Sequence, residues 1–321
     1  MTWVVTGGAG YIGAHVVRAF QAAGIDIVVL DNLASGHREF VPAGVPLVEA
    51  SIADRVALNT VFADHSIEGV VHLAGYKYAG ESVKFPLEAY HHNVTGTAVL
   101  LEAMANAGVA NVVFSSSAAV YGTPSTDVVT ESTPTNPQSP YGETKLIGEW
   151  LIRDQAVATE LSHTSLRYFN VVGSGTDDVV DTSPHNLFPL IFRALAEGRT
   201  PAIFGDDYPT PDGTCVRDYV HVADVAAAHV SAAQALMSGT ALEAVYNLGS
   251  GSGTSVGEIM SAVATVTGID FEPEIKPRRA GDPSRIVADG KLAARDLGWE
   301  QRHTVESMVA TAWSAHSAHA K

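Results

Sequence analysis

The chain has little cysteine, few basic residues and no long apolar run, and each shortage excludes a class of protein. The single cysteine among 321 residues, Cys215, cannot form an internal disulfide, which is typical of a reducing compartment. Lysine and arginine number 19 against 35 acidic residues, and the net charge of −16 disfavours nucleic acid as a partner. No run approaches the ~20 apolar residues that span a bilayer, and no signal-peptide pattern opens the chain. We therefore expect a cytoplasmic, globular protein without a membrane partner.

Apolar residues make up 46% of the chain, and in its first two-thirds strand-like runs alternate with helical stretches. The strand candidates are residues 3–6, 26–30, 45–49, 69–73, 112–116 and 164–168. The helix candidates between them are residues 11–23, 55–65, 86–108 and 141–159. Because such alternation with continuously apolar strands is typical of βαβ units, we expect an α/β fold with a doubly wound parallel (Rossmann) sheet.

The pattern changes after residue 170, where Gly, Pro and Asp cluster at 173–184 and 205–213. Shorter helices are expected at residues 187–197, 222–236, 256–267 and 305–316. This change predicts a first domain over residues 1–170 and a smaller C-terminal region over 171–321. We expect residues 216–249 to return to the first domain.

A glycine-rich segment, residues 7–13, follows the first strand and opens the first helix. Glycines allow the backbone to approach a pyrophosphate, and a helix N-terminus offers free N–H groups. Asp31, at the end of the next strand, can accept hydrogen bonds from the adenosine ribose and would repel a 2′-phosphate. A tight turn followed by a surface aspartate is the alternative, but this order of elements favours a site for NAD rather than NADP.

Tyr141 and Lys145 are four residues apart and therefore share one face of a helix. An ammonium near a phenol stabilises the phenolate and lowers its pKa, so the pair could act as a general base toward an alcohol. Residues 115–117 are serines at the end of a core strand, where an open α/β sheet presents ligands. The same Tyr-Lys spacing occurs by chance on exposed helices, yet with these serines it predicts a catalytic set of Ser117, Tyr141 and Lys145.

Further strings make the chain resemble the extended short-chain dehydrogenase/reductase family, and within it the UDP-glucose (UDP-galactose) 4-epimerases, over nearly its whole length. The most specific string is Phe204-Gly-Asp-Asp-Tyr-Pro-Thr-Pro-Asp-Gly213, followed by Val216-Arg-Asp-Tyr219. Others are Leu73-Ala-Gly-Tyr-Lys77, Ser115-Ser-Ser-Ala-Ala-Val-Tyr-Gly122, Arg167-Tyr-Phe-Asn170 and Pro277-Arg-Arg-Ala-Gly-Asp282. The resemblance implies an NAD-dependent isomerase of galactose metabolism that converts UDP-galactose to UDP-glucose through a 4-keto sugar. It also implies a homodimer formed through the helices near residues 86–108 and 141–159.

The resemblance further implies which residues contact the two ligands. No histidine or cysteine pattern typical of a zinc site occurs in the sequence, so we expect no metal. The first domain would hold NAD, with contacts from Gly7, Gly10, Tyr11, Ile12, Gly13, Asp31, Asn32, Ser51, Ile52, Leu73, Ala74, Lys77, Asn93, Ser115, Tyr141, Lys145 and Phe169. The C-terminal region would mainly hold the UDP-sugar, with contacts from Lys77, Ser117, Tyr141, Asn170, Asn186, Leu187, Ala202, Phe204, Arg217, Arg279, Asp282 and Ile286. Guanidinium groups such as that of Arg217 pair well with diphosphate oxygens.

Three positions depart from the pattern of the family. Ser51 stands where members often have an aspartate that contacts adenine, and Tyr78 stands where some members have a small residue. Ile286 replaces a tyrosine found in some members, which predicts room for an acetamido group on C2 of the sugar. We therefore expect some turnover of UDP-N-acetylglucosamine.

Two other functions remain open on the sequence alone. A sugar-nucleotide 4,6-dehydratase shares the fold and the first oxidation, but it needs an acid/base pair beside the catalytic hydroxyl, and Ala118 and Ala119 stand at those positions. A non-catalytic dinucleotide-sensing protein would need the glycine loop but not Ser117, Tyr141 and Lys145 together. The product formed from UDP-galactose separates the three.

Overall fold

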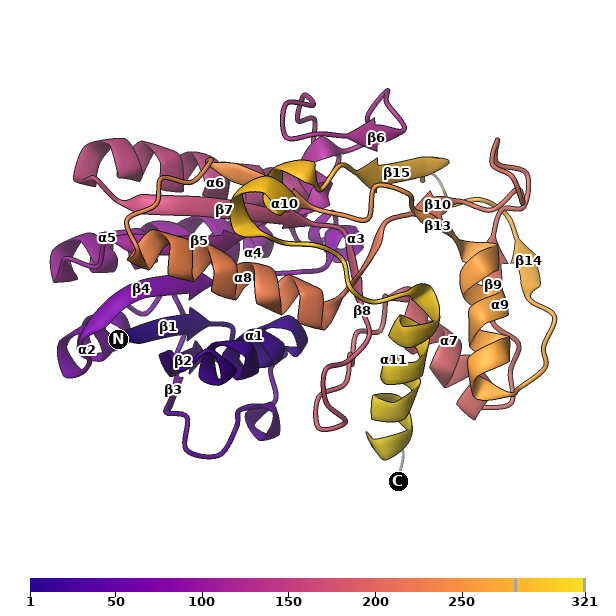
Figure 1. Ribbon diagram of the computed structural model, residues 1–321, viewed down its shortest axis with the longest axis horizontal. Coiled ribbons are helices and arrows are strands. Elements are labelled where there is room, and N and C mark those ends of the chain that lie inside the picture. The colour runs from indigo at the N-terminus through magenta and orange to yellow at the C-terminus, as the bar shows by residue number, and fades with distance from the viewer. Residues whose placement is uncertain (280–281, 320–321) are drawn as a thin grey trace.

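The computed structural model describes residues 1–279 and 282–319, and a parallel sheet forms its centre (Figure 1). Among these residues, seven strands form this sheet in the order β12-β7-β5-β4-β1-β2-β3. Their bounds are β1 Thr2–Thr6, β2 Asp26–Asp31, β3 Leu47–Glu49, β4 Ile67–His72, β5 Asn111–Ser115, β7 Ser162–Tyr168 and β12 Val245–Leu248. The expected doubly wound parallel sheet is confirmed. Because all its strands are parallel, their carboxyl ends meet at one edge, where ligands bind in such folds.

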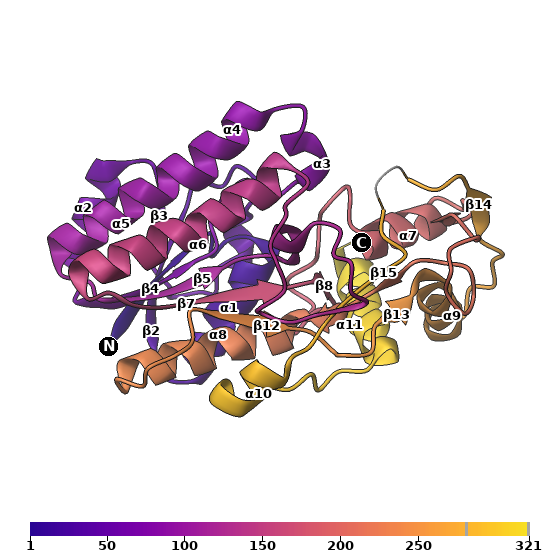
Figure 2. The ribbon, with the colours of Figure 1, turned by 90° about the horizontal axis from the view of Figure 1, so that it is seen from above.

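Two helical layers cover the sheet (Figure 2). One face carries α1 (Tyr11–Ala22), α8 (Val222–Met237) and α10 (Lys291–Leu297), and the other carries α2 (Arg55–Asp64), α5 (Gly96–Ala107) and α6 (Pro140–Thr159). Successive side chains of each strand point to opposite faces of the sheet. Val5 therefore packs with the α1–α8 layer and Val4 with the α2–α5 layer. Both valines are fully buried. The continuously apolar strands of the sequence are explained by this two-sided burial.

The helix expected over residues 86–108 is interrupted. It consists of α4 (Pro86–Tyr90), a π-helical turn η2 (His91–Thr95) and α5, and a short α3 (Ala79–Ser82) precedes it. The wide turn places Asn93 in the interior, where its Oδ1 accepts the Tyr76 N–H at 2.6 Å and its Nδ2 donates to Thr144 Oγ1 at 2.8 Å. The π-turn therefore ties the loop after β4 to α6, and such turns are frequent near functional sites.

The C-terminal region lies beside the carboxyl edge of the sheet, at the right of Figure 1. Its apolar cluster is built mainly from α7 (Leu187–Ala196), α9 (Val256–Thr267) and α11 (Val305–His319). Short strands form three smaller sheets, β13-β10-β15-β6, β11-β8 and β14-β9. Their bounds are β6 Val128–Val129, β8 Asn170–Val172, β9 Ala202–Phe204, β10 Val216–Arg217, β11 Tyr219–His221, β13 Thr254–Ser255, β14 Glu274–Lys276 and β15 Arg285–Ala288. Two 3₁₀ turns, η1 (Arg38–Phe40) and η3 (Ala118–Tyr121), complete the elements of the described residues.

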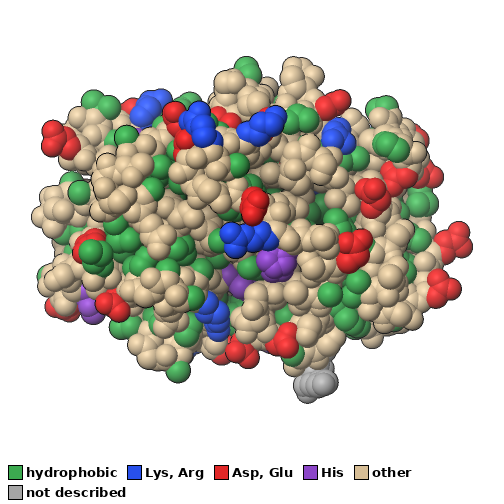
Figure 3. Space-filling view, in the orientation of Figure 1, with side chains coloured by type: hydrophobic (Ala, Val, Ile, Leu, Met, Phe, Trp, Pro, Cys, Tyr) green, Lys and Arg blue, Asp and Glu red, His purple; other side chains and the backbone are tan. Residues whose placement is uncertain are grey.

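None of the helices within the described ranges has the length and apolarity needed to cross a membrane. The face seen in Figure 3 carries scattered charged side chains, with acidic ones along the margin formed by the C-terminal region. This distribution agrees with the low charged fraction of 17% and the acidic balance of the chain.

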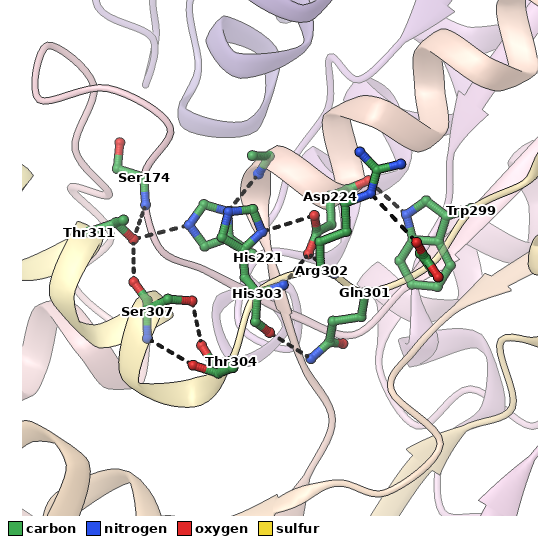
Figure 4. A network of polar contacts seen from close by, with 12 residues as sticks. Ser174, His221, Asp224, Trp299, Gln301, Arg302, His303, Thr304, Ser307 and Thr311 are labelled. Carbon is green, nitrogen blue, oxygen red and sulfur yellow. Dashed lines mark hydrogen bonds and ion pairs between the residues drawn. The ribbon is translucent and has the colours of Figure 1, made fainter.

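Buried histidines connect the two regions (Figure 4). The His221 ring accepts the Ala223 N–H at Nδ1 and contacts Thr311 of α11 through Nε2 at 3.0 Å, and it stacks on His303 with ring centroids 3.7 Å apart. In α1, His15 accepts the Gly175 N–H at Nε2, at 2.9 Å. A ring nitrogen that accepts a backbone N–H carries no proton, so both imidazoles are neutral in this arrangement.

Acidification is expected to destabilise the protein through these two histidines. Burial lowers the pKa of His15 to about 4 and that of His221 to about 3, below the value near 6.5 of an unfolded chain. Below about pH 6.5 the unfolded state therefore binds protons that the folded state does not, and stability is lost as the pH falls toward these folded values. Urea titrations between pH 7.5 and 4 should show the free energy of unfolding decreasing. His221→Gln should flatten that slope relative to His91→Gln, a change at an exposed histidine; equal slopes would refute the role of His221.

Candidate functional site

A cavity of about 790 Å³ opens at the carboxyl edge of the sheet, between the first region and the C-terminal region. The structure brings most of the sequence-predicted residues to its wall. These are Gly7, Gly10, Tyr11, Ile12, Gly13, Asp31, Asn32, Ser51, Ile52, Leu73, Ala74, Lys77, Ser117, Tyr141, Lys145, Phe169, Asn170, Asn186, Leu187, Arg217, Arg279 and Asp282.

The loop between β1 and α1 has the shape of a pyrophosphate cradle. Gly7 has φ +73, and a Cβ on it would lie 2.7 Å from the Ala74 nitrogen. A Cβ on Gly13 would lie 2.0 Å from the Gly7 carbonyl oxygen, so only glycine fits there. Gly10 is the N-cap of α1 and no side chain caps this helix end, which leaves N–H groups of its first turn available. These features fit the pyrophosphate of a dinucleotide.

Asp31 ends β2 at the side of this cradle and is 7% exposed. Its carboxylate accepts the Ala9 N–H at 3.0 Å and the Leu33 N–H at 2.8 Å, which fixes it at the cavity wall. A Cβ on Gly36 would lie only 2.9 Å from Asp31 Oδ1, so the loop after β2 closes tightly over the carboxylate. Nearby, Ser51 lines the cavity while its Oγ accepts the Ala53 N–H. The pocket therefore offers a fixed anionic acceptor for a ribose.

The three residues predicted to be catalytic meet in this cavity. Tyr141 lies in the first turn of α6, where its N–H donates to Ser82 Oγ at 3.0 Å, and its phenol shares a hydrogen bond with Ser117. Lys145 lies one turn later, 7% exposed, with its Nζ donating to the Ser115 carbonyl at 2.8 Å and 6.0 Å from the centre of the Tyr141 ring.

The pKa of Tyr141 differs from the sequence-based expectation. We expected Lys145 to lower the pKa of Tyr141, but burial raises it, and the hydrogen bond with Ser117 opposes that rise. The physical reason is that desolvation of the phenol disfavours its charged form, while the Lys145 ammonium is directed to the Ser115 carbonyl rather than to the phenol oxygen. Burial also lowers the pKa of Lys145 to about 8, and the Glu149 carboxylate opposes this.

Positive side chains face the cavity from the C-terminal region. Arg217 of β10 donates to the Val216 and Pro283 carbonyls through Nη1, and its Nη2 lies 3.5 Å from Asp282. The guanidinium of Arg279 lies over the Phe204 ring, 4.0 Å from its centroid. Two guanidinium groups at one end of a cavity can bind a diphosphate. Ala280 and Gly281, which belong to the same motif, lie outside the described residues.

Five predicted contact residues lie behind the wall rather than on it: Asn93, Ser115, Ala202, Phe204 and Ile286. Asn93 uses its amide within the protein, and the Ser115 Oγ contacts His229 Nε2 at 2.7 Å. Ala202 and Phe204 belong to β9, and the Phe204 ring supports Arg279. Ile286 is 9% exposed in β15, where its backbone pairs with Arg217 of β10, and it does not line the cavity.

The cavity also has lining residues that sequence reasoning missed. Asp181 is a partly buried carboxylate that accepts from Asn186 Nδ2 at 2.8 Å; desolvation raises its pKa, and the Asn186 hydrogen bond and the Lys77 charge oppose that rise. His185 Nε2 lies 3.3 Å from Glu81 Oε1, which connects the loop before α7 to α3 across the cavity. His185 and Glu81, like Asp181 and Lys77, are about a hundred positions apart in the chain. No local sequence pattern indicates a contact between residues so far apart.

Comparisons with known proteins agree with this geometry. Residues 3–249 match the NAD dependent epimerase/dehydratase family. The chain is similar to the UDP-glucose 4-epimerase of Lactobacillus helveticus, with 44% identity over 326 residues that cover 100% of this chain and 98% of that protein. A Stenotrophomonas maltophila UDP-glucose-4-epimerase, solved with bound NAD and formylated UDP-arabinopyranose, superposes with a TM-score of 0.95 at 40% identity, covering 100% and 99% of the two chains. The Brucella ovis UDP-glucose 4-epimerase in complex with NAD gives 0.92 at 39% identity, covering 97% of each.

Proposed function

The chain belongs to the UDP-glucose 4-epimerases of the NAD dependent epimerase/dehydratase family, and from that premise we propose how its cavity performs the reaction. The reaction is the NAD-dependent 4-epimerisation of UDP-hexoses, in which UDP-galactose becomes UDP-glucose through a 4-keto sugar. The observation that carries the proposal is the meeting of Ser117, Tyr141 and Lys145 in the same cavity as the glycine cradle.

Tyr141 is the group that moves the proton. As the phenolate it takes the proton of the sugar 4-hydroxyl, and it returns the proton to the 4-oxygen after the keto sugar has turned its other face. Ser117, hydrogen-bonded to the phenol, is placed to bind the same sugar oxygen. Burial raises the pKa of Tyr141, and a positive charge on Lys145, one helical turn away, acts against that rise and favours the phenolate form.

Residues around the cradle hold NAD, which when bound supplies the hydride acceptor and donor at C4. The uncapped N-terminus of α1 would face the pyrophosphate, and Asp31 would accept hydrogen bonds from the adenosine ribose. Lys77 lies between Asp31 and Asp181, whose charges oppose the burial that lowers its pKa. We assign this part of the site to residues 1–170. From the segment 216–249 we count α8 and β12 with them, because these belong to the same layers, whereas β10 at its start pairs with β13 and β15 of the C-terminal region.

The C-terminal region anchors the UDP moiety. Arg217 and Arg279 are placed to pair with the diphosphate, and Asn170, Asn186, Leu187 and Asp282 are placed to contact the remainder of the nucleotide sugar. An anchor at the diphosphate leaves the hexose free to turn, which epimerisation requires. In this proposal Ile286 lies outside the residues that line the cavity. It would therefore affect the choice of hexose only through the residues in front of it.

Product analysis tests this function against its alternatives. Purified protein given UDP-galactose should produce UDP-glucose, whereas a 4,6-dehydratase would produce a keto-deoxy sugar and a sensing protein would produce neither. At the turn η3 after Ser117, Ala118 and Ala119 offer only methyl groups, so they cannot remove the C5 proton. A keto-deoxy product would overturn the proposal.

Cofactor choice is expected to depend on Asp31. Its fixed carboxylate should repel a 2′-phosphate, so that denatured protein releases NAD(H) with little NADP(H). Asp31→Asn should raise the NADP share of the extract because the negative charge is removed. Liquid chromatography of both extracts checks this, and a wild-type extract consisting mostly of NADP would contradict the assignment.

A cytoplasmic homodimer is proposed for the assembled enzyme. Large apolar side chains are exposed on the segment before and within α4 and on α6: Val83, Phe85, Leu87, Trp150 and Val157. A partner copy covering these helices would remove that surface from water. Light scattering of the purified protein should therefore give twice the chain mass of 33.6 kDa.

A further inference from the structure

Glu149 is a buried carboxylate in α6, one helical turn after Lys145. Tyr141, Lys145 and Glu149 follow one another at intervals of four residues, so they form a stripe along one face of α6. The Glu149 side chain is 6% exposed. A carboxylate in such a place is costly unless it is paired, so its surroundings indicate what it does.

Glu149 joins the two strands that carry the site. Its Oε2 accepts from Arg167 Nη2 at 2.6 Å, and its Oε1 accepts from Arg167 Nε at 2.8 Å and from the Ser116 hydroxyl. Ser116 follows Ser115, whose carbonyl holds the Lys145 ammonium. One carboxylate therefore connects α6 to the end of β5 and to β7.

Most other titratable groups near Lys145 are uncharged near neutral pH. Burial lowers the pKa of His72 on β4 to about 3 and that of His229 on α8 to about 4, and it raises the pKa values of the phenols. The phenols are Tyr141 on α6, Tyr168 on β7 and Tyr121 on η3. Among the described residues packed around Lys145, this leaves the Glu149–Arg167 pair as the nearby charges, with Glu149 the carboxylate that attracts the ammonium.

We infer that Glu149 is a positioning residue for the reaction: held by Arg167 and Ser116, it keeps the Lys145 ammonium charged and in place beneath Tyr141. This inference rests on the proposed function, because Lys145 matters through the phenolate it favours. It adds a residue that touches neither substrate nor cofactor.

Opposite pH shifts follow from the two partners of the pair. Glu149→Gln removes the attraction and leaves the Arg167 charge uncompensated, so Lys145 should lose its proton at lower pH. Arg167→Gln leaves the Glu149 charge uncompensated, so Lys145 should keep its proton to higher pH. Both variants should be less stable, because each leaves one buried charge unpaired. A loss of stability alone cannot move the two profiles in opposite directions.

The test is the pH dependence of kcat/KM for UDP-galactose, measured for the NAD-loaded wild type and the variants. The wild-type alkaline limb, expected near pH 8 from Lys145, should move down by about one unit in Glu149→Gln and up in Arg167→Gln. Glu149→Asp keeps the charge and should keep the wild-type limb, although its rate is expected to fall. Asp154→Asn, which alters an exposed carboxylate of the same helix, should match the wild type.

The outcomes separate the inference from the function on which it rests. A wild type that forms no UDP-glucose would refute the proposed function itself. An active wild type whose alkaline limb is unchanged in Glu149→Gln and Arg167→Gln, or moves the same way in both, would overturn the role of Glu149. If Glu149→Gln does not fold, the other two variants still test the inference. It then requires that the alkaline limb of kcat/KM moves up in Arg167→Gln and stays at its wild-type position in Glu149→Asp.

Discussion

Tyr141→Phe is expected to lower kcat for UDP-galactose by about 10²-fold or more, the usual size of a general acid–base contribution. The change removes one hydroxyl from a partly buried ring and leaves the backbone contact with Ser82 in place. The fold and the bound NAD should therefore remain. Initial rates, the NAD content of the purified protein and its melting temperature check the three parts of this expectation.

Tyr246→Phe is the matched control. Tyr246 is a fully buried tyrosine, and its hydroxyl donates to Asp296 at 3.0 Å in a different part of the molecule. Removal of the Tyr246 hydroxyl should lower the melting temperature but leave kcat unchanged. A wild-type kcat in Tyr141→Phe would show that another group moves the proton.

Gly13→Ala is expected to deplete the protein of NAD. The added methyl group would meet the Gly7 carbonyl oxygen at 2.0 Å, so the cradle or the first turn of α1 must shift. Overpacking of this kind costs about 1–3 kcal/mol, which corresponds to roughly a tenfold to hundredfold weaker binding if the cofactor site absorbs it. NAD content after gel filtration and activity with and without added NAD measure the effect.

Gly80→Ala separates this effect from the general cost of changing a glycine. A Cβ on Gly80 in α3 meets nothing within 4 Å, so NAD content and activity should equal those of the wild type. Full NAD occupancy in Gly13→Ala would mean that the loop deforms at little cost and does not form the cradle.

The central sheet and much of the cavity wall could be predicted because local patterns encode them. Buried parallel strands are apolar on both faces, so their positions stand out, and loops that follow them must meet at one edge. Glycine at 13 is required by its contact with Gly7 within the same turn, and Tyr141 and Lys145 share one helix face. In each case the physical constraint acts over a few residues.

Other features depend on pairings between distant segments, which no local pattern shows. Strands of two residues, such as β10 and β13, have too few side chains for a period to be visible. The π-turn at η2 exists because Asn93 has partners in two other segments. Likewise, the burial of Ile286 follows from the pairing of β15 with β10, and the position of Asp181 follows from a long loop.

The edge strand β12 and the covering helix α8 also affect how the chain folds while it is being made. When residue 170 has left the ribosome, β7 is paired with β5 on one side but still lacks β12 on the other. The apolar face that α1 covers still lacks α8. An unpaired strand edge beside exposed apolar surface favours association with other chains. The nascent N-terminal segment therefore depends on continued synthesis, or on a chaperone, until residue 248 has been added. The first region therefore cannot complete its fold before part of the second half of the chain has been synthesised.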